Sequence, residues 1–64
     1  MMLNGKTAML EREQTLLEFL TTANFDLKTI AVERNGVIVP KAEYENIRLE
    51  DEDTLEIVRF VGGG

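Results

Sequence analysis

The chain has 64 residues and a formal net charge of −5, and 44% of its residues are hydrophobic. This length allows one small domain, and the hydrophobic content is ordinary for a globular protein. Cys, His, Ser and Trp are all absent, which excludes disulfides, zinc fingers, thiolate nucleophiles and imidazole bases. The acidic balance argues against nucleic acids and anionic membrane surfaces as partners, and it favours a basic protein surface.

The sequence has no apolar run with the length of a signal peptide or of a membrane-spanning helix. We therefore expect a cytoplasmic protein. A chain this short buries little surface and has no disulfide to help, so a binding or carrier role is favoured over an enzymatic cleft.

The N-terminus is predicted to form a β-hairpin. Residues 1–3 are apolar, and the Asn4-Gly5 pair that follows them tolerates positive φ at the centre of a tight turn. Residues 7–10 can then return antiparallel to residues 1–3, in a register that the sequence leaves open.

A helix is predicted to begin after Thr15. Thr15 and Glu18 have the spacing of a capping box, in which each side chain binds the backbone N–H of the other residue. The apolar stripe of this helix consists of Leu16, Leu20 and Ala23, with Leu17 and Phe19 beside it. The helix should end at residue 23 or 24, with Phe25 folded back over its end as a core residue.

Two further strands are predicted around a second Asn-Gly turn. Residues 30–34 alternate like a half-buried strand, with Ile30 and Val32 facing inward. Asn35-Gly36 then predicts a tight turn into a short strand over residues 37–39.

A polar segment follows, and Pro40 either ends the preceding strand or confines it to a sheet edge. Residues 41–46 should turn or form a short helical segment that carries Tyr44, with Ile47 and Leu49 as apolar anchors beneath it. We interpret Tyr44 as a packing residue whose hydroxyl reaches water, and not as an acid–base group.

The longest acidic run is Glu50-Asp51-Glu52-Asp53. We interpret it as a solvated turn before the last strand. Four consecutive carboxylates do not converge on a cation by themselves, so a metal site is disfavoured.

The last predicted strand, residues 54–61, becomes apolar on both faces. Leu55 and Ile57 share the face toward the helix, whereas the opposite face carries Val58 and Phe60. The pattern alone allows either of two arrangements: Val58 and Phe60 are exposed, or a neighbouring element covers them.

The order of elements is strand, strand, helix, strand, short strand, strand, which predicts an α+β fold with two layers. One main helix packs on one face of a mixed sheet of four to five strands. The first and last strands can pair in the centre of this sheet.

The sequence ends in Gly62-Gly63-Gly64. A frayed tail or an expression remnant would explain three glycines. Alternatively, residues without side chains can extend through a narrow channel and bring a terminal carboxylate to a reactive centre inside another protein.

Taken together, these segments resemble the ThiS family, the sulfur carrier proteins of thiamin biosynthesis. The resemblance covers essentially the whole chain and is carried by Asn4-Gly5, residues 15–20, residues 30–40, the acidic turn 51–53 and the ending 56–64. The family often has a glycine in the acidic turn where this chain has Glu52, which alters the turn and not the tail.

The resemblance implies a ubiquitin-like β-grasp domain over residues 1–61 and a flexible tail over residues 62–64. A ThiF-like adenylyltransferase would use ATP to convert the Gly64 carboxylate to an acyl adenylate, and a sulfur donor protein would then leave a thiocarboxylate on Gly64. A ThiG-like thiazole synthase would accept this sulfur. The chain would be a carrier and not an enzyme, and it would bind no cofactor or metal of its own.

With this resemblance, exposure of Val58 and Phe60 becomes the favoured alternative. Together with Val61, they would dock on the partner enzymes. Gly62 and Gly63 would then thread into the active site of each partner.

Other functions remain open at this stage. MoaD, the small subunit of molybdopterin synthase, has the same fold, tail and activation chemistry, although such chains are usually longer. A sulfur carrier for another pathway, such as cysteine synthesis or tRNA thiolation, would look alike. A β-grasp interaction module with incidental glycines would need no terminal carboxylate.

Overall fold

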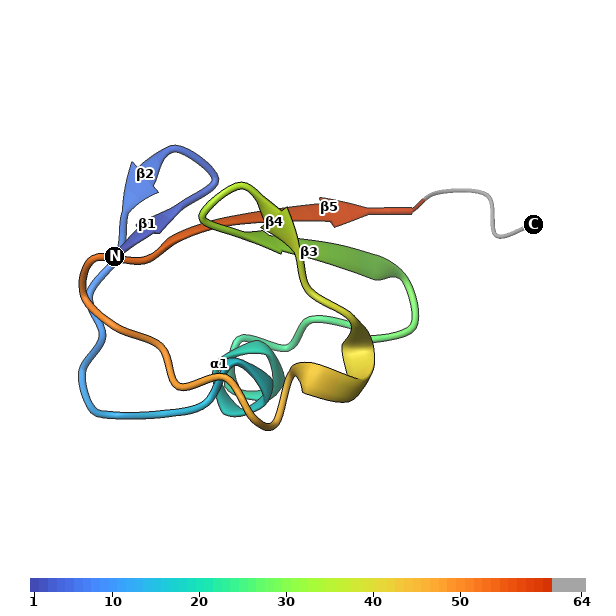
Figure 1. The fold of residues 1–64 in the computed structure, drawn as a ribbon, viewed down its shortest axis with the longest axis horizontal. Coiled ribbons are helices and arrows are strands. Elements are labelled where there is room, and N and C mark those ends of the chain that lie inside the picture. The colour runs from blue at the N-terminus through green and yellow to red at the C-terminus, as the bar shows by residue number, and fades with distance from the viewer. Residues whose placement is uncertain (61–64) are drawn as a thin grey trace.

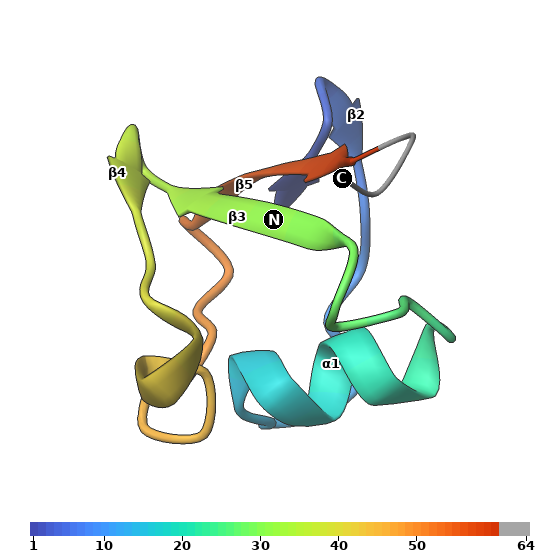
Figure 2. The same cartoon turned by 90° about the vertical axis from the view of Figure 1, so that its right-hand side faces the viewer.

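The computed structural model describes residues 1–60, which form two layers. A five-stranded sheet is one layer, and the helices lie on one side of it (Figure 1; Figure 2). The strands are β1 (Met2–Leu3), β2 (Lys6–Thr7), β3 (Ile30–Arg34), β4 (Val37–Ile38) and β5 (Thr54–Arg59). The helices are α1 (Leu16–Thr22) and the 3-10 helix η1 (Lys41–Glu43). This is the two-layer α+β arrangement that the sequence predicts.

Strand β5 lies in the centre of the sheet, whose order is β2-β1-β5-β3-β4. It runs parallel to β1 and antiparallel to β3, so the sheet is mixed. The predicted pairing of the first and last strands is confirmed. Strand β3 pairs with residues 55–59 of β5, and β1 pairs with Thr54 and Leu55 only. The half of β5 that leads to the C-terminal tail is therefore held in the sheet mainly by β3.

Both Asn-Gly pairs form the predicted tight turns. Asn4 and Gly5 have φ values of 50° and 82°, and Asn35 and Gly36 have values of 53° and 84°. Two consecutive positive φ angles define the turn whose twist matches that of the flanking antiparallel strands. The two central positions of each turn therefore require residues that tolerate the left-handed region.

The return strand of the first hairpin is shorter than predicted and begins one residue earlier. Met2 pairs with Thr7 and Leu3 pairs with Lys6. The Ala8 N–H then donates to the Met1 carbonyl oxygen at 2.8 Å, and the chain leaves the sheet toward α1 (Figure 1). Residues 9 and 10 are not part of β2, because the connection must cross from the sheet layer to the helix layer.

Helix α1 begins with the predicted capping box. The Thr15 hydroxyl accepts a hydrogen bond from the Glu18 N–H at 3.1 Å, and the Thr15 N–H donates to Glu18 Oε1 at 2.8 Å. Each bond satisfies a backbone N–H that the helix itself leaves free. Leu16 and Leu20 are fully buried on the side toward the sheet.

The predicted apolar stripe is wrong at Ala23, which is exposed. The helix ends at Thr22, so Ala23 is its C-cap and lies beyond the part that covers the core. Asn24, with φ of 65°, reverses the chain. Phe25 then donates its N–H to the Leu20 carbonyl oxygen at 3.0 Å and packs against the core, as expected.

The core fills the space between the sheet and the helices. Its buried residues are Leu16, Leu20, Ile30, Val32, Val39, Tyr44, Leu49, Leu55 and Ile57. The inward positions predicted on β3 and β5 are thus confirmed.

Tyr44 follows η1 and is 3% exposed, which confirms its interpretation as a packing residue. Burial raises the pKa of its phenol above the ordinary value. Leu49 is buried and Ile47 is half-buried against the same cluster, so both act as the expected anchors.

Candidate functional site

The end of β5 combines a fixed backbone with exposed apolar side chains. Val58 is 57% exposed and Phe60 is 55% exposed, so the favoured alternative from the sequence is confirmed. The Phe60 N–H donates to the Thr29 carbonyl oxygen at 2.6 Å, which holds the backbone at the last described residue. Because this anchor fixes the backbone, Phe60 presents its side chain in a defined place.

Val61, Gly62, Gly63 and Gly64, which the sequence predicts to be site residues, lie outside the described residues. Strand β5 runs from the β1–β2 hairpin to the opposite end of the molecule (Figure 1). The segment that follows Phe60 therefore starts at the end of the fold farthest from this hairpin.

The sheet face turned away from α1, which we call the outer face, is not covered by any element of residues 1–60 (Figure 2). The strand registers place on this face Met2, Thr7, Ala31, Glu33, Ile38, Thr54, Glu56 and Val58. Phe60, directly after β5, continues the outward alternation of Glu56 and Val58. Met2, Ile38, Val58 and Phe60 are large, apolar and exposed. A protein surface that presents several such side chains together is typical of a docking surface.

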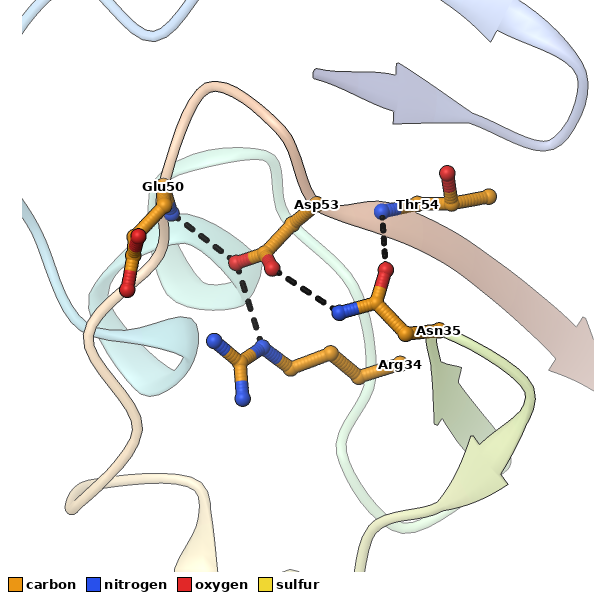
Figure 3. A network of polar contacts seen from close by, with 5 residues as sticks. All are labelled: Arg34, Asn35, Glu50, Asp53 and Thr54. Atoms are coloured by element: carbon orange, nitrogen blue, oxygen red, sulfur yellow. Dashed lines mark hydrogen bonds and ion pairs between the residues drawn. The ribbon is translucent and has the colours of Figure 1, made fainter.

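The acidic turn contains a buried carboxylate that the sequence interpretation missed. Asp53 is 4% exposed, so the expectation of a solvated turn is wrong at this residue, whereas Asp51 and Glu52 are exposed as expected. The Asp53 carboxylate accepts hydrogen bonds from Arg34 Nε at 3.1 Å, Asn35 Nδ2 at 3.0 Å and the Glu50 N–H at 2.9 Å (Figure 3). These bonds join the acidic turn to the β3–β4 hairpin.

The pKa of Asp53 results from two opposing effects. Burial of the carboxyl raises its pKa, but the hydrogen bonds from Glu50, Asn35 and Arg34 and the charge of Arg34 outweigh it. The net effect is a pKa below the ordinary value of aspartate. Asp53 is therefore a structural anion at the start of β5.

The two turn asparagines also hold β5 through their side chains. Asn4 Nδ2 donates to the Ile57 carbonyl oxygen at 3.3 Å, and Asn4 Oδ1 accepts from the Ile57 N–H at 2.7 Å. Asn35 Oδ1 accepts from the Thr54 N–H at 2.9 Å (Figure 3). In the sequence, these two asparagines are recognisable only as turn residues, because a local pattern does not show the distant strand that they contact.

We expect Asn4→Gly to destabilise the isolated domain by about 1–2 kcal/mol, because it removes both side-chain bonds to Ile57. Glycine tolerates the positive φ at this position, so the loss reports the amide contacts and not backbone strain. Urea unfolding gives the measurement. An unchanged midpoint would show that the Asn4 amide contributes nothing to holding β5.

The remaining described surface offers little other chemistry. Residues 1–60 contain no group of three or more Asp or Glu side chains placed to hold a metal ion. Their helices are too short to cross a lipid bilayer. The candidate site is therefore the outer face together with the end of β5.

Comparison with known proteins finds relatives that match nearly the whole of this chain. The profile of the ThiS family matches residues 1–64. The sulfur carrier protein ThiS of Bacillus subtilis is 40% identical over 63 residues, which cover 97% of this chain and 96% of that protein. Thiazole synthases of Paramagnetospirillum magneticum and Magnetococcus marinus are 39% and 37% identical over 64 and 62 residues. The chain spans only 20% and 19% of the length of these two proteins.

The crystal structure of a thiamine biosynthesis protein (ThiS) from Geobacter metallireducens has the same fold. It superimposes with a TM-score of 0.83 at 24% sequence identity, covering 98% of this chain and 96% of that one. The ubiquitin-like β-grasp fold that the resemblance implied is thereby confirmed. Since the family profile matches every residue and the Bacillus relative is matched over nearly its full length, this chain belongs to the ThiS family.

Proposed function

We propose that this protein is a sulfur carrier for thiazole formation in thiamin biosynthesis, and that Gly64 is its reacting residue. A ThiF-like adenylyltransferase binds ATP, and the Gly64 carboxylate attacks the α-phosphate and releases pyrophosphate. A sulfur donor protein then supplies the sulfur that displaces AMP, leaving a thiocarboxylate. Carboxylate oxygen is a poor leaving group and adenylate is a good one, so the ATP-dependent step makes the exchange possible.

The observation that carries this proposal is the position of Val58 and Phe60. Both are exposed, and both lie in the last described residues before the glycine tail. An apolar docking surface there directs Gly62 and Gly63 into a partner's active site. Nucleophile, nucleotide pocket and metal belong to that partner, which agrees with a chain that lacks Cys, His and Ser.

A thiazole synthase is the proposed acceptor of the sulfur. The two relatives named thiazole synthase each contain a segment similar to nearly the whole of this chain. A carrier and a synthase that occur in one polypeptide support a functional link between the two. Because the activation consumes ATP, we place it in the cytoplasm.

The proposal is tested by the intact mass of the protein after incubation with ATP, a sulfur donor and the adenylyltransferase of its host. We expect a gain equal to the exchange of one oxygen for sulfur, localised to Gly64 by fragmentation. Omission of ATP is the control and should prevent the gain. An unchanged mass with an enzyme that is active on its own carrier would overturn the proposal.

We expect Phe60→Ala to weaken binding to the adenylyltransferase by about 30-fold, as for a central aromatic contact of an interface. Because Phe60 is 55% exposed, the melting temperature of the isolated domain should change by only about 2–3 °C. Val37→Ala is the matched control, since Val37 is 66% exposed on the edge strand β4 and far along the chain from the tail. Equal losses of affinity in the two variants, or unfolding of Phe60→Ala, would contradict the docking role.

A further inference from the structure

Two glutamates face each other on the outer face. The antiparallel register of β3 and β5 pairs Glu33 directly with Glu56. Side chains at such paired positions are about 5 Å apart at Cβ, and like charges placed there destabilise the sheet. The isolated domain therefore keeps an arrangement that works against its own stability.

Among residues 1–60, no ion pair involves either glutamate of this pair. The ion pairs among residues 1–60 are Arg34 with Asp53 and Arg48 with Glu13, and neither involves Glu33 or Glu56. The outward positions of the described strands include no Lys or Arg, and residues 61–64 include none in sequence.

Apolar side chains lie on both sides of the pair. Ile38 of β4 is opposite Glu33, and Val58 follows Glu56 by one outward position on β5. Ile38 and Val58 are 69% and 57% exposed. The carboxylates thus lie between exposed apolar residues, and they are continuous along β5 with the proposed docking surface at Phe60.

We propose that the Glu33–Glu56 pair binds an arginine of the adenylyltransferase when the outer face docks on that enzyme. A guanidinium is planar, has five N–H donors and is weakly hydrated, so it can bridge two neighbouring carboxylates within an apolar rim. An enzyme that holds ATP against an acidic carrier needs positive charge around the entrance of its active site. The inference rests on the proposed function for the identity of this partner.

The test uses Glu33→Gln, Glu56→Gln and the double variant, with Glu52→Gln as the matched control. Glu52 is exposed in the acidic turn, so its variant makes the same change of charge away from the outer face. We expect each single variant to bind the adenylyltransferase about tenfold more weakly in calorimetry, and the control to change less than about twofold. The double variant should also show a weaker dependence of affinity on salt.

Stability distinguishes the proposed binding role from a structural role. If the pair binds the partner, removing the like charges should raise the melting temperature of the isolated double variant by about 1–5 °C while its affinity falls. If the pair stabilised the fold, the melting temperature would fall instead. Unchanged affinity for the adenylyltransferase, or a loss confined to thiazole synthase, would overturn the proposal. Phe60→Ala measured in the same series distinguishes the failures: if it still weakens binding, the carrier function stands and only the arginine contact is wrong.

Discussion

Asp53→Ala should lower the free energy of unfolding by about 3 kcal/mol, because it removes a buried carboxylate that accepts three hydrogen bonds, one of them from the partly exposed Arg34. The substitution leaves Arg34, Asn35 Nδ2 and the Glu50 N–H without their shared acceptor. A domain of this length has a total stability of about 3–10 kcal/mol. The melting temperature should therefore fall by about 12–24 °C in calorimetry. This is the largest loss of stability that we expect from an acidic residue of the chain.

Asp51→Ala is the control for this variant. Asp51 is in the same turn but exposed, so its stability should stay within about 0.5 kcal/mol of the unchanged protein. The stability of Asp53→Asn should lie between those of Asp53→Ala and Asp51→Ala. Its amide oxygen can still accept a hydrogen bond from Arg34, but its amide nitrogen cannot accept one from the remaining donors. Similar melting temperatures for Asp53→Ala and Asp51→Ala would show that the network in Figure 3 does not stabilise the fold.

The same carboxylate makes stability depend on pH. The pKa of Asp53 is lower in the folded protein than in the unfolded chain, so the folded state binds fewer protons near that pKa. Its contribution is complete above the ordinary aspartate pKa of about 3.9 and is lost as the pH falls through the lower folded value. Because asparagine does not titrate, the free energy of unfolding of Asp53→Asn should depend less on pH below about pH 4 than that of the unchanged protein.

The features that the sequence predicts correctly are those determined by residues close to one another in the chain. Positive φ is tolerated by Asn-Gly, and Thr15 and Glu18 are three residues apart, so the hairpins and the start of α1 follow from short patterns. Alternation along residues 54–60 likewise assigns the two faces of β5. Each of these signals depends on neighbours within one or two turns of the chain.

Features that depend on residues distant in sequence do not follow from local patterns. Asp53 looks like its acidic neighbours in sequence, and only the fold brings Arg34 to it across 18 intervening positions. Glu33 and Glu56 can each be assigned to an outward position from alternation, but their direct opposition depends on the register between β3 and β5. The error at Ala23 has a similar origin, since the end of α1 is set by where Phe25 must return to the core.

Addition of one alanine after Gly64 should slow conversion to the thiocarboxylate by at least about 100-fold. The extra residue moves the reacting carboxylate by about 3.5 Å, and errors of 1 Å in positioning already cost about that factor. Binding to the adenylyltransferase should persist, because the proposed docking residues Val58 and Phe60 are unchanged. Intact mass measures the conversion and calorimetry measures the binding.

Gly64→Ala distinguishes the position of the terminal carboxylate from the need for a residue without a side chain, since it keeps the length of the tail and adds one methyl group. If this variant is converted slowly and the extended chain is not converted, the position of the carboxylate matters more than the absence of a side chain. An interaction module gives a different result: it keeps full partner binding and function with the added alanine, because no terminal carboxylate takes part. Retained function in the extended chain would therefore exclude the carrier mechanism while leaving the outer face as an ordinary protein-binding surface.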